Sequence, residues 1–169
     1  LPPRAAATCD LTNLNAAVGA CLAVDPVQGQ CPCGPIDSWD VSSVTALTST
    51  FADARLFNGD LSKWNVSKVT SLASTFYNTT FNGDLSKWDV RSVTALTSTF
   101  ADARAFNGDL SKWDVRQVTS LKSTFHGAKA FHGDLSSWNV SSVTDLASTF
   151  QRAKAFVGGD LSKWNVRQV

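Results

Sequence analysis

The sequence predicts an α/β repeat solenoid in which each coil of about 25 residues contributes one short parallel strand and one short helix. The first observation is a regular tryptophan interval: six Trp residues stand at positions 39, 64, 88, 113, 138 and 164. The second is an apolar pattern that recurs within each interval, and the third is a group of four cysteines confined to the first 35 residues. A fixed period of this length is typical of repeats that stack on one another. We therefore expect a Cys-rich N-terminal cap at 1–35 and a repeat domain at 36–169, with about five and a half coils.

Within one repeat, the apolar residues predict the order strand, helix and turn. The segment from Leu61 to Leu72 reads Leu-x-x-Trp-x-Val-x-x-Val-x-x-Leu, which is leucine-rich-repeat spacing. Trp64 and Val66 alternate as the inward residues of a short strand do. Thr70 suits a helix N-cap, and the spacing from Leu72 to Phe76 is helical. A Phe-Asn-Gly-Asp turn closes the coil.

Stacking of such coils predicts columns of like residues. One column is formed by the six Trp, a second by Phe51, Phe76, Phe100, Phe125 and Phe150, and a third by Phe57, Phe81, Phe106, Phe131 and Phe156. We expect these rings in the core, because one coil alone cannot hide so much aromatic surface. A one-residue deletion after Phe76 and an insertion at 157–159 fall in the same arc, which predicts the loop side of the coil.

The four cysteines predict a disulfide-linked cap in a secreted protein. Cys9, Cys21, Cys31 and Cys33 are even in number, and only the last two are close enough in sequence to resemble a pair of zinc ligands. A helix over 10–23 would hold Cys9 and Cys21 too far apart to bond, so each is expected to pair with Cys31 or Cys33. The start Leu-Pro-Pro-Arg, without Met, predicts an N-terminus processed after removal of a signal peptide.

The repeat resembles a known family. Residues 81–100, which read FNGDLSKWDVRSVTALTSTF, are similar to the DUF285 lipoprotein-type repeat, which is grouped with BspA-like leucine-rich repeats, and the resemblance covers about 36–169. It implies secreted or surface-exposed proteins linked to adhesion, without enzymatic activity. Two positions that are Met in the family are here Leu and Thr. The Leu keep the core, whereas Thr50, Thr75, Thr99, Thr124 and Thr149 predict a more exposed or tighter helix face.

No set of residues predicts catalysis, a metal or a cofactor. His126 and His132 are the only histidines, the chain has no Glu, and neither an acid–base pair nor a triad is evident. A column of Asp follows Gly in each coil: Asp60, Asp84, Asp109, Asp134 and Asp160. A calcium ladder and turn capping are the two interpretations, and turn capping is favoured because only one carboxylate recurs per coil. A net charge of +1 argues against a nucleic-acid partner, and no apolar run is long enough for a membrane span.

Two kinds of surface feature remain. Outward positions of the predicted strands form a candidate interaction face of mixed charge: Lys63, Lys87, Asp89, Arg91, Lys112, Asp114, Arg116 and Lys163. Such rows are typical of a solvated sheet face, with a docking surface as the other interpretation. Three sequons offer glycosylation sites at Asn78, Asn65 and Asn139, and Asn78 is preferred because it lies in the predicted loop arc.

Together these features predict a noncatalytic structural or adhesion protein, extracellular or on the cell surface. It is expected to be a surface or filament component that self-associates head-to-tail through its solenoid ends, or that binds other surface proteins or glycans. The sequence stops at Val169, before the next expected helix, which fits either a fragment of a longer array or an end on which another subunit docks. The alternative function is a recognition module that binds a protein or glycan on its sheet face.

Overall fold

The computed structural model describes residues 9–157 and 159–169. The prediction of a processed N-terminus at 1–4 lies outside the described residues. The same holds for Gly158, the middle residue of the 157–159 insertion.

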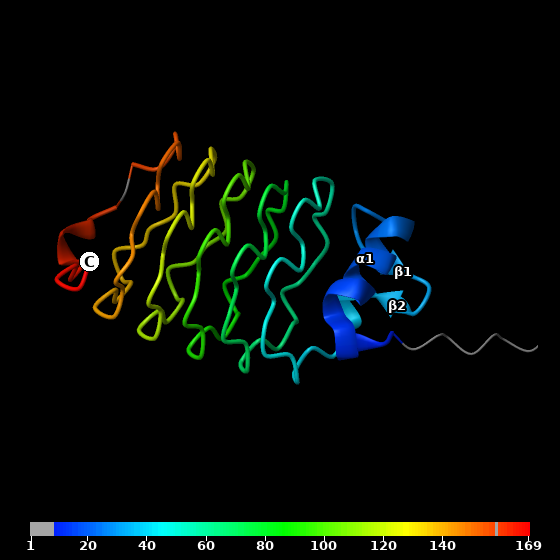
Figure 1. The fold of residues 1–169 in the computed structure, drawn as a ribbon. Helices are drawn as coiled ribbons and strands as arrows, with labels where there is room; N and C mark the ends of the chain where they lie inside the picture. The colour runs from blue at the N-terminus through cyan, green and yellow to red at the C-terminus, as the bar shows by residue number, and fades with distance from the viewer. Residues whose placement is uncertain (1–8, 158) are drawn as a thin grey trace, which may run out of the picture.

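The N-terminal segment forms a small cap at one end of the molecule (Figure 1). It consists of the 3-10 helix η1 (Leu11–Asn13), the helix α1 (Leu14–Val24), the strands β1 (Gln30–Cys31) and β2 (Gly34–Pro35), and the 3-10 helix η2 (Ile36–Ser38). The helix α1 begins after Asn13, whose side chain accepts a hydrogen bond from the amide of Ala16, as N-cap residues do. The two strands pair antiparallel and form the one sheet within the described residues.

Two disulfides join these elements, as the cysteine count predicts. Cys9 bonds to Cys33 and Cys21 to Cys31, with Cα–Cα distances of 5.3 and 5.0 Å. The prediction that Cys9 and Cys21 do not pair with each other is confirmed, because Cys21 lies on α1 and Cys9 precedes it. Both bonds connect the helical half of the cap to the hairpin.

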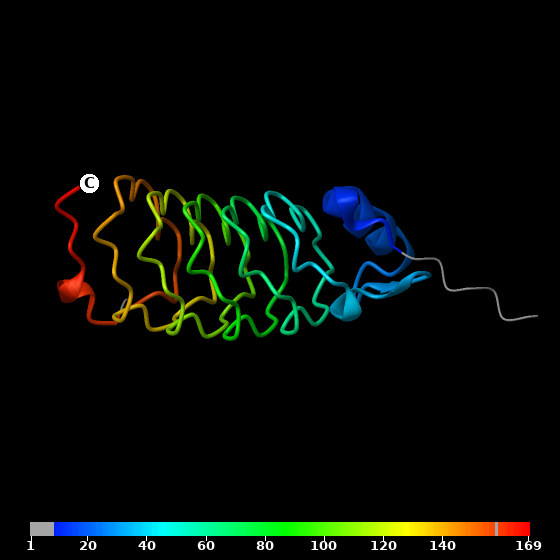
Figure 2. The ribbon, with the colours of Figure 1, turned by 90° about the horizontal axis from the view of Figure 1, so that it is seen from below.

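After the cap, the chain runs in successive coils that lie side by side (Figures 1 and 2). The predicted α/β fold class is nevertheless wrong. Between Trp39 and Val157 no residue belongs to an α-helix or to a multi-residue strand, and the coils meet only at isolated parallel bridges such as Ala46 to Ser71. The leucine-rich-repeat-like arrangement of one strand and one helix per coil is therefore absent from this range. The remaining regular element is the 3-10 helix η3 (Leu161–Lys163).

A run of consecutive turns takes the place of the predicted helix. The amides of Leu47, Ser49 and Phe51 donate to carbonyls of the next coil, at 2.9 to 3.0 Å, while the alternate amides of Thr50 and Ala52 donate three residues back at 3.1 Å. A helix would direct all its amides along its own axis, so this division between coils excludes one. The geometry requires Ser49 to adopt a left-handed backbone with φ of 57°, and Ser74, Ser98, Ser123 and Ser148 do the same in later coils.

The threonines predicted as helix N-caps instead tie neighbouring coils together. The amide and the hydroxyl of Thr70 both donate to the carbonyl of Thr45, at 2.8 and 3.1 Å. Thr94, Thr119 and Thr144 repeat the arrangement on the preceding threonine. The capping role assigned to these residues is wrong, because no helix begins at any of them.

The aromatic columns form the core of the stack, as predicted. Phe76 stacks on Phe51 and on Phe100 with ring centroids 5.6 Å apart in both cases, and on Phe81 of its own coil at 4.4 Å. From Trp64 onward each indole nitrogen also donates to a carbonyl about one coil earlier, as Trp88 does to Leu61 at 3.0 Å. The glycine of each Phe-Asn-Gly-Asp turn leaves room for the adjacent ring, because a Cβ at Gly59, Gly83 or Gly108 would lie within 3.0 Å of a Phe ring atom.

The threonines that stand where the family has its second Met form a buried polar column rather than an exposed helix face. Thr75, Thr99 and Thr124 are fully buried. The hydroxyl of Thr99 lies 2.8 Å from the carbonyl of Leu96 and 2.9 Å from that of Leu72 in the preceding coil. A hydroxyl shared between two carbonyls is satisfied without water, which allows burial of this polar group. The prediction of a more exposed or tighter helix face is therefore wrong, because these threonines are buried and belong to no helix.

The cap continues this bonding pattern on its side of the first coil. Thr50 has no preceding coil, and its hydroxyl donates instead to the side-chain oxygen of Asn15 on α1, at 2.8 Å. The amide nitrogen of Asn15 donates to the carbonyl of Thr48, at 3.0 Å. Asn15 thus takes the place of a backbone peptide of an earlier coil.

Candidate interaction surfaces

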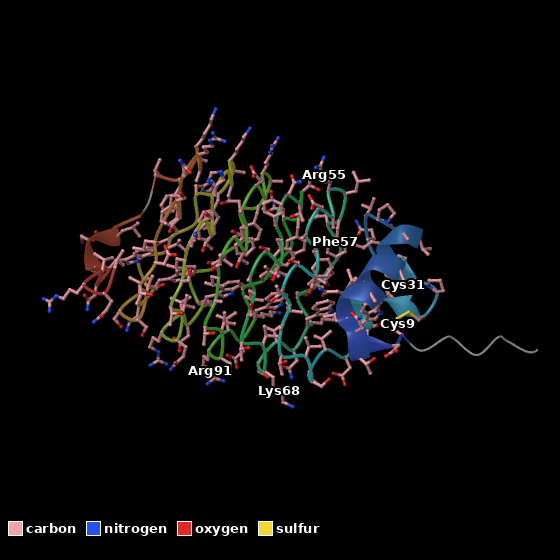
Figure 3. The ribbon with its side chains drawn as sticks, viewed as in Figure 1. Cys9, Cys31, Arg55, Phe57, Lys68 and Arg91 are labelled. Atoms are coloured by element: carbon pink, nitrogen blue, oxygen red, sulfur yellow. A yellow bond between two sulfur atoms is a disulfide. The ribbon has the colours of Figure 1, made fainter. Side chains whose placement is uncertain are left out.

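Of the candidate interaction face, Figure 3 labels Arg91, which lies on the edge of the stack opposite to Arg55. Four of the eight charged residues of this face pair with one another. Arg91 donates from two nitrogens to both carboxylate oxygens of Asp89, at 2.8 and 2.7 Å, and Arg116 does the same with Asp114. These hydrogen bonds hold the pKa of Asp89 and of Asp114 below the usual range.

The lysines of this face are exposed, and Lys63 forms an ion pair with Asp37 at 3.0 Å. The face lies on irregular coils rather than on a sheet, so the predicted sheet face is wrong as a structural description. Side chains that already neutralise one another have less free charge to offer a partner. Arg91 and Arg116 therefore have less free charge to offer a partner, whereas within the described residues no ion pair involves Lys87, Lys112 or Lys163.

The aspartate column caps turns, which confirms the interpretation favoured by the sequence. Asp84 accepts from the amide of Ser86 and Asp109 from that of Ser111, at 2.8 and 2.9 Å. The amide and hydroxyl of Ser86 lower the pKa of Asp84, and the hydroxyl and amide of Ser111 lower that of Asp109. Within the described residues, no group of three or more His, Cys, Asp or Glu is arranged to hold a metal ion.

These lowered pKa values predict a loss of stability in acid. A carboxylate whose pKa is lower in the folded than in the unfolded chain stabilises the fold above its unfolded pKa, about 4, and this contribution disappears as the pH falls. The thermal midpoint should therefore fall steadily between about pH 5 and pH 2. The double variant Asp84→Asn, Asp109→Asn keeps an acceptor at each turn but cannot titrate, so its midpoint should fall less over the same range. Identical pH profiles for the two proteins would contradict this assignment.

A ladder of side-chain amides accompanies the aspartates. The side-chain oxygen of Asn58 accepts from the amide of Asn82, and that of Asn82 from the amide of Asn107, both at 2.7 Å. His132 continues the row: its amide donates to Asn107 at 2.9 Å. His126 lies half-buried on another part of the coil and does not share a site with His132. The histidines thus occupy repeat positions with structural contacts.

The sequons differ in the accessibility of the atom that would carry a glycan. The amide nitrogen of Asn78 donates to Asp53 at 2.6 Å, and its side chain is half-buried. Asn65 and Asn139 are exposed, and each uses only its oxygen, to accept from the serine two residues later. This geometry favours Asn65 and Asn139 over Asn78, the reverse of the preference drawn from the loop arc.

A second charged surface, on the opposite edge from Arg91, was not singled out from the sequence. It carries Arg55, which Figure 3 labels, and equivalent cations of later coils: Arg104, Lys129, Lys154 and the nearby Arg152. The signal was present, because Arg55, Arg104, Lys129 and Lys154 all stand two residues before a Phe of the third column. Thr80 interrupts the row in the second coil, which hides its regularity. We call this surface the cationic edge.

These observations define a stack of Trp- and Phe-lined coils closed on one side by a disulfide-linked cap. A family model described as "Mycoplasma protein of unknown function, DUF285" matches residues 33–107 and 71–169, so the chain belongs to the DUF285 family. Searches of curated proteins and of solved structures found no match. No helix in the described residues is long and apolar enough to cross a membrane.

Proposed function

We propose that this protein is a noncatalytic structural or adhesion protein that acts outside the cell or on its surface. The observation that supports the proposal most is the register of the coils. Backbone ladders and stacked rings hold equivalent residues of successive coils in line, so each surface position recurs as a row along the stack. Repeated rows on a rigid body suit multivalent contact with a partner that is itself repetitive.

The disulfides support an extracellular location. Both pairs of Cys lie in the cap, and such bonds persist in oxidising environments rather than in the cytosol. An extracellular scaffold of this kind would meet polysaccharides and surface proteins, which are the partners proposed for it.

Self-association is part of the proposal, and the cap limits its geometry. A further coil placed on the cap side of the first coil would need to bond to the carbonyl of Thr48 and the hydroxyl of Thr50. Asn15 already occupies both of these groups. A head-to-tail contact would therefore use the outer surface of the cap, while the rows along the stack remain open to lateral contacts.

The test combines polymer binding with assembly state. The full chain is passed over immobilised alginate, dextran and collagen, and its mass in solution is followed by sedimentation. We expect saturable binding to at least one surface, or concentration-dependent assembly, with the polymer length unchanged after prolonged contact. A monomer that binds none of the three, or a protein that shortens a polymer catalytically, would refute the proposal.

A further inference from the structure

The cationic edge concentrates the positive charge of the molecule. It is formed by the turns at 52–56, 77–80, 101–105, 126–130 and 151–155. These turns hold five Arg and Lys against two Asp, a net charge of +3, whereas the whole chain has +1. The remainder of the chain is thus slightly acidic. Nitrogen-tipped side chains project from the green, yellow and orange coils at the edge where Arg55 is labelled (Figure 3).

The cations of this edge are less neutralised than the arginines of the opposite edge. Arg91 and Arg116 each form a bidentate pair with an aspartate. In the described part of the chain, ion pairs on the cationic edge are confined to Arg55, which lies 4.0 Å from Asp53 with both side chains largely exposed. Arg104, Lys129 and Lys154 are exposed to solvent and remain available to an anion.

The backbone beneath these side chains is ordered by hydrogen bonds between coils. The amide of Asn78 donates to Ala101 at 2.8 Å, and that of Gly127 to Gln151 at 2.8 Å. Ala103 and Ala128, which each directly precede a cation of the row, are fully buried. The row therefore advances by one strand-to-strand spacing, about 4.8 Å, per coil.

The shorter second coil opens a notch in this row. Thr80 stands where the first and third coils have Arg55 and Arg104, and one residue is missing beside it. The resulting groove, about 240 Å³ in volume, is lined by Arg55, Asn78, Thr79, Thr80, Asp102 and Arg104. Two guanidinium groups flank it, beside the one carboxylate of its lining, Asp102, and guanidinium forks match the geometry of carboxylates and sulfates.

We propose that the cationic edge binds an acidic polysaccharide that lies along the stack, with one acidic group in the notch and others on Arg104, Lys129 and Lys154. A linear polymer with regularly spaced anions matches a linear row of cations one coil apart. The oxidising environment indicated by the disulfides favours an extracellular polymer over a nucleic acid, and so does the near-neutral charge of the whole chain. This inference rests on the proposed function and specifies its ligand.

The experiment measures the affinity of the full chain for alginate, a linear polyuronate, with dextran as the neutral polymer. The edge variant is Arg104→Gln, Lys129→Gln, Lys154→Gln, and the matched control is Lys87→Gln, Lys112→Gln, Lys163→Gln, which removes three exposed charges elsewhere. Three screened surface contacts are worth about tenfold or more in affinity together. We expect that loss for the edge variant and a much smaller one for the control, with wild-type binding abolished by high salt. Equal thermal midpoints would show that both variants are folded.

Equal losses in the two variants would overturn the inference, as would tighter binding to duplex DNA or to anionic vesicles than to alginate. Binding to dextran or collagen, or self-association, without any effect of the edge variant would overturn the inference and leave the proposed function standing. A monomer that binds none of these probes would refute both.

Discussion

Replacement of Phe100 by Ala is expected to destabilise the protein by about 3–5 kcal/mol, the usual cost of removing a buried aromatic ring. Phe100 is fully buried and packs against Phe76, Phe125 and Trp113 of the adjoining coils and against Phe106 of its own. The cavity would open at the centre of two interfaces between coils, so neither neighbour can close it alone. Urea unfolding followed by Trp fluorescence measures the loss.

The matched control is Tyr77→Ala. Tyr77 is also aromatic and directly follows Phe76 of the same column, but 39% of its surface is exposed. Surface substitutions of this kind change stability by about 0.5 kcal/mol or less. A comparable loss in the two variants would show that the stacked columns are not the main source of stability.

Loss of the disulfides is expected to cost about 2–4 kcal/mol per bond, with an effect concentrated at one end of the molecule. The bonds span sequence separations of 24 and 10 residues, both within the cap. In stacked repeats each unit contacts only its neighbours, so local destabilisation spreads poorly. Reduction, or the quadruple Cys→Ser variant, should raise hydrogen exchange at the Ser49 and Phe51 amides of the first coil. The amide of Phe125, three coils away, should keep its protection.

An Asn15→Ala variant separates the covalent from the noncovalent contribution of the cap. It removes the two bonds to Thr48 and Thr50 but leaves both disulfides intact. We expect faster exchange in the first coil alone. Uniform loss of protection in all coils, in either protein, would show that the stack unfolds as a single cooperative unit and would contradict this prediction.

The repeat period was the most informative property of the sequence. It predicted the Trp and Phe columns, because residues at equivalent positions of stacked coils must meet, and the Asp turn caps followed from the known preference of that side chain. The cysteine positions excluded the Cys9–Cys21 pair by distance alone. The order in which Cys31 and Cys33 are used could not be predicted, because both lie within reach of either partner.

The predicted helix in each coil was wrong because two conformations, a helix and a run of turns, satisfy the same apolar spacing. Leu72 and Phe76 are four residues apart, which suits one face of a helix, but the run of turns also directs both inward. The turns depend on left-handed serines such as Ser74, and serine has no preference for that conformation that a sequence reveals. The buried Thr column was misjudged for a related reason: its partners are backbone carbonyls of another coil, which no local pattern identifies.

The direction of the hydrogen bonds between coils gives the stack an electrical polarity. The amides of Leu72, Ser74, Phe76 and Asn78 all donate to carbonyls of the following coil, whereas those of Thr70 and Asn82 donate to the preceding one. Strand dipoles in an ordinary sheet largely cancel, whereas peptide dipoles of about 3.5 D that point the same way add. Each interface between coils thus contributes a dipole with its positive pole toward the C-terminal side, so the two directions along the axis are electrostatically distinct.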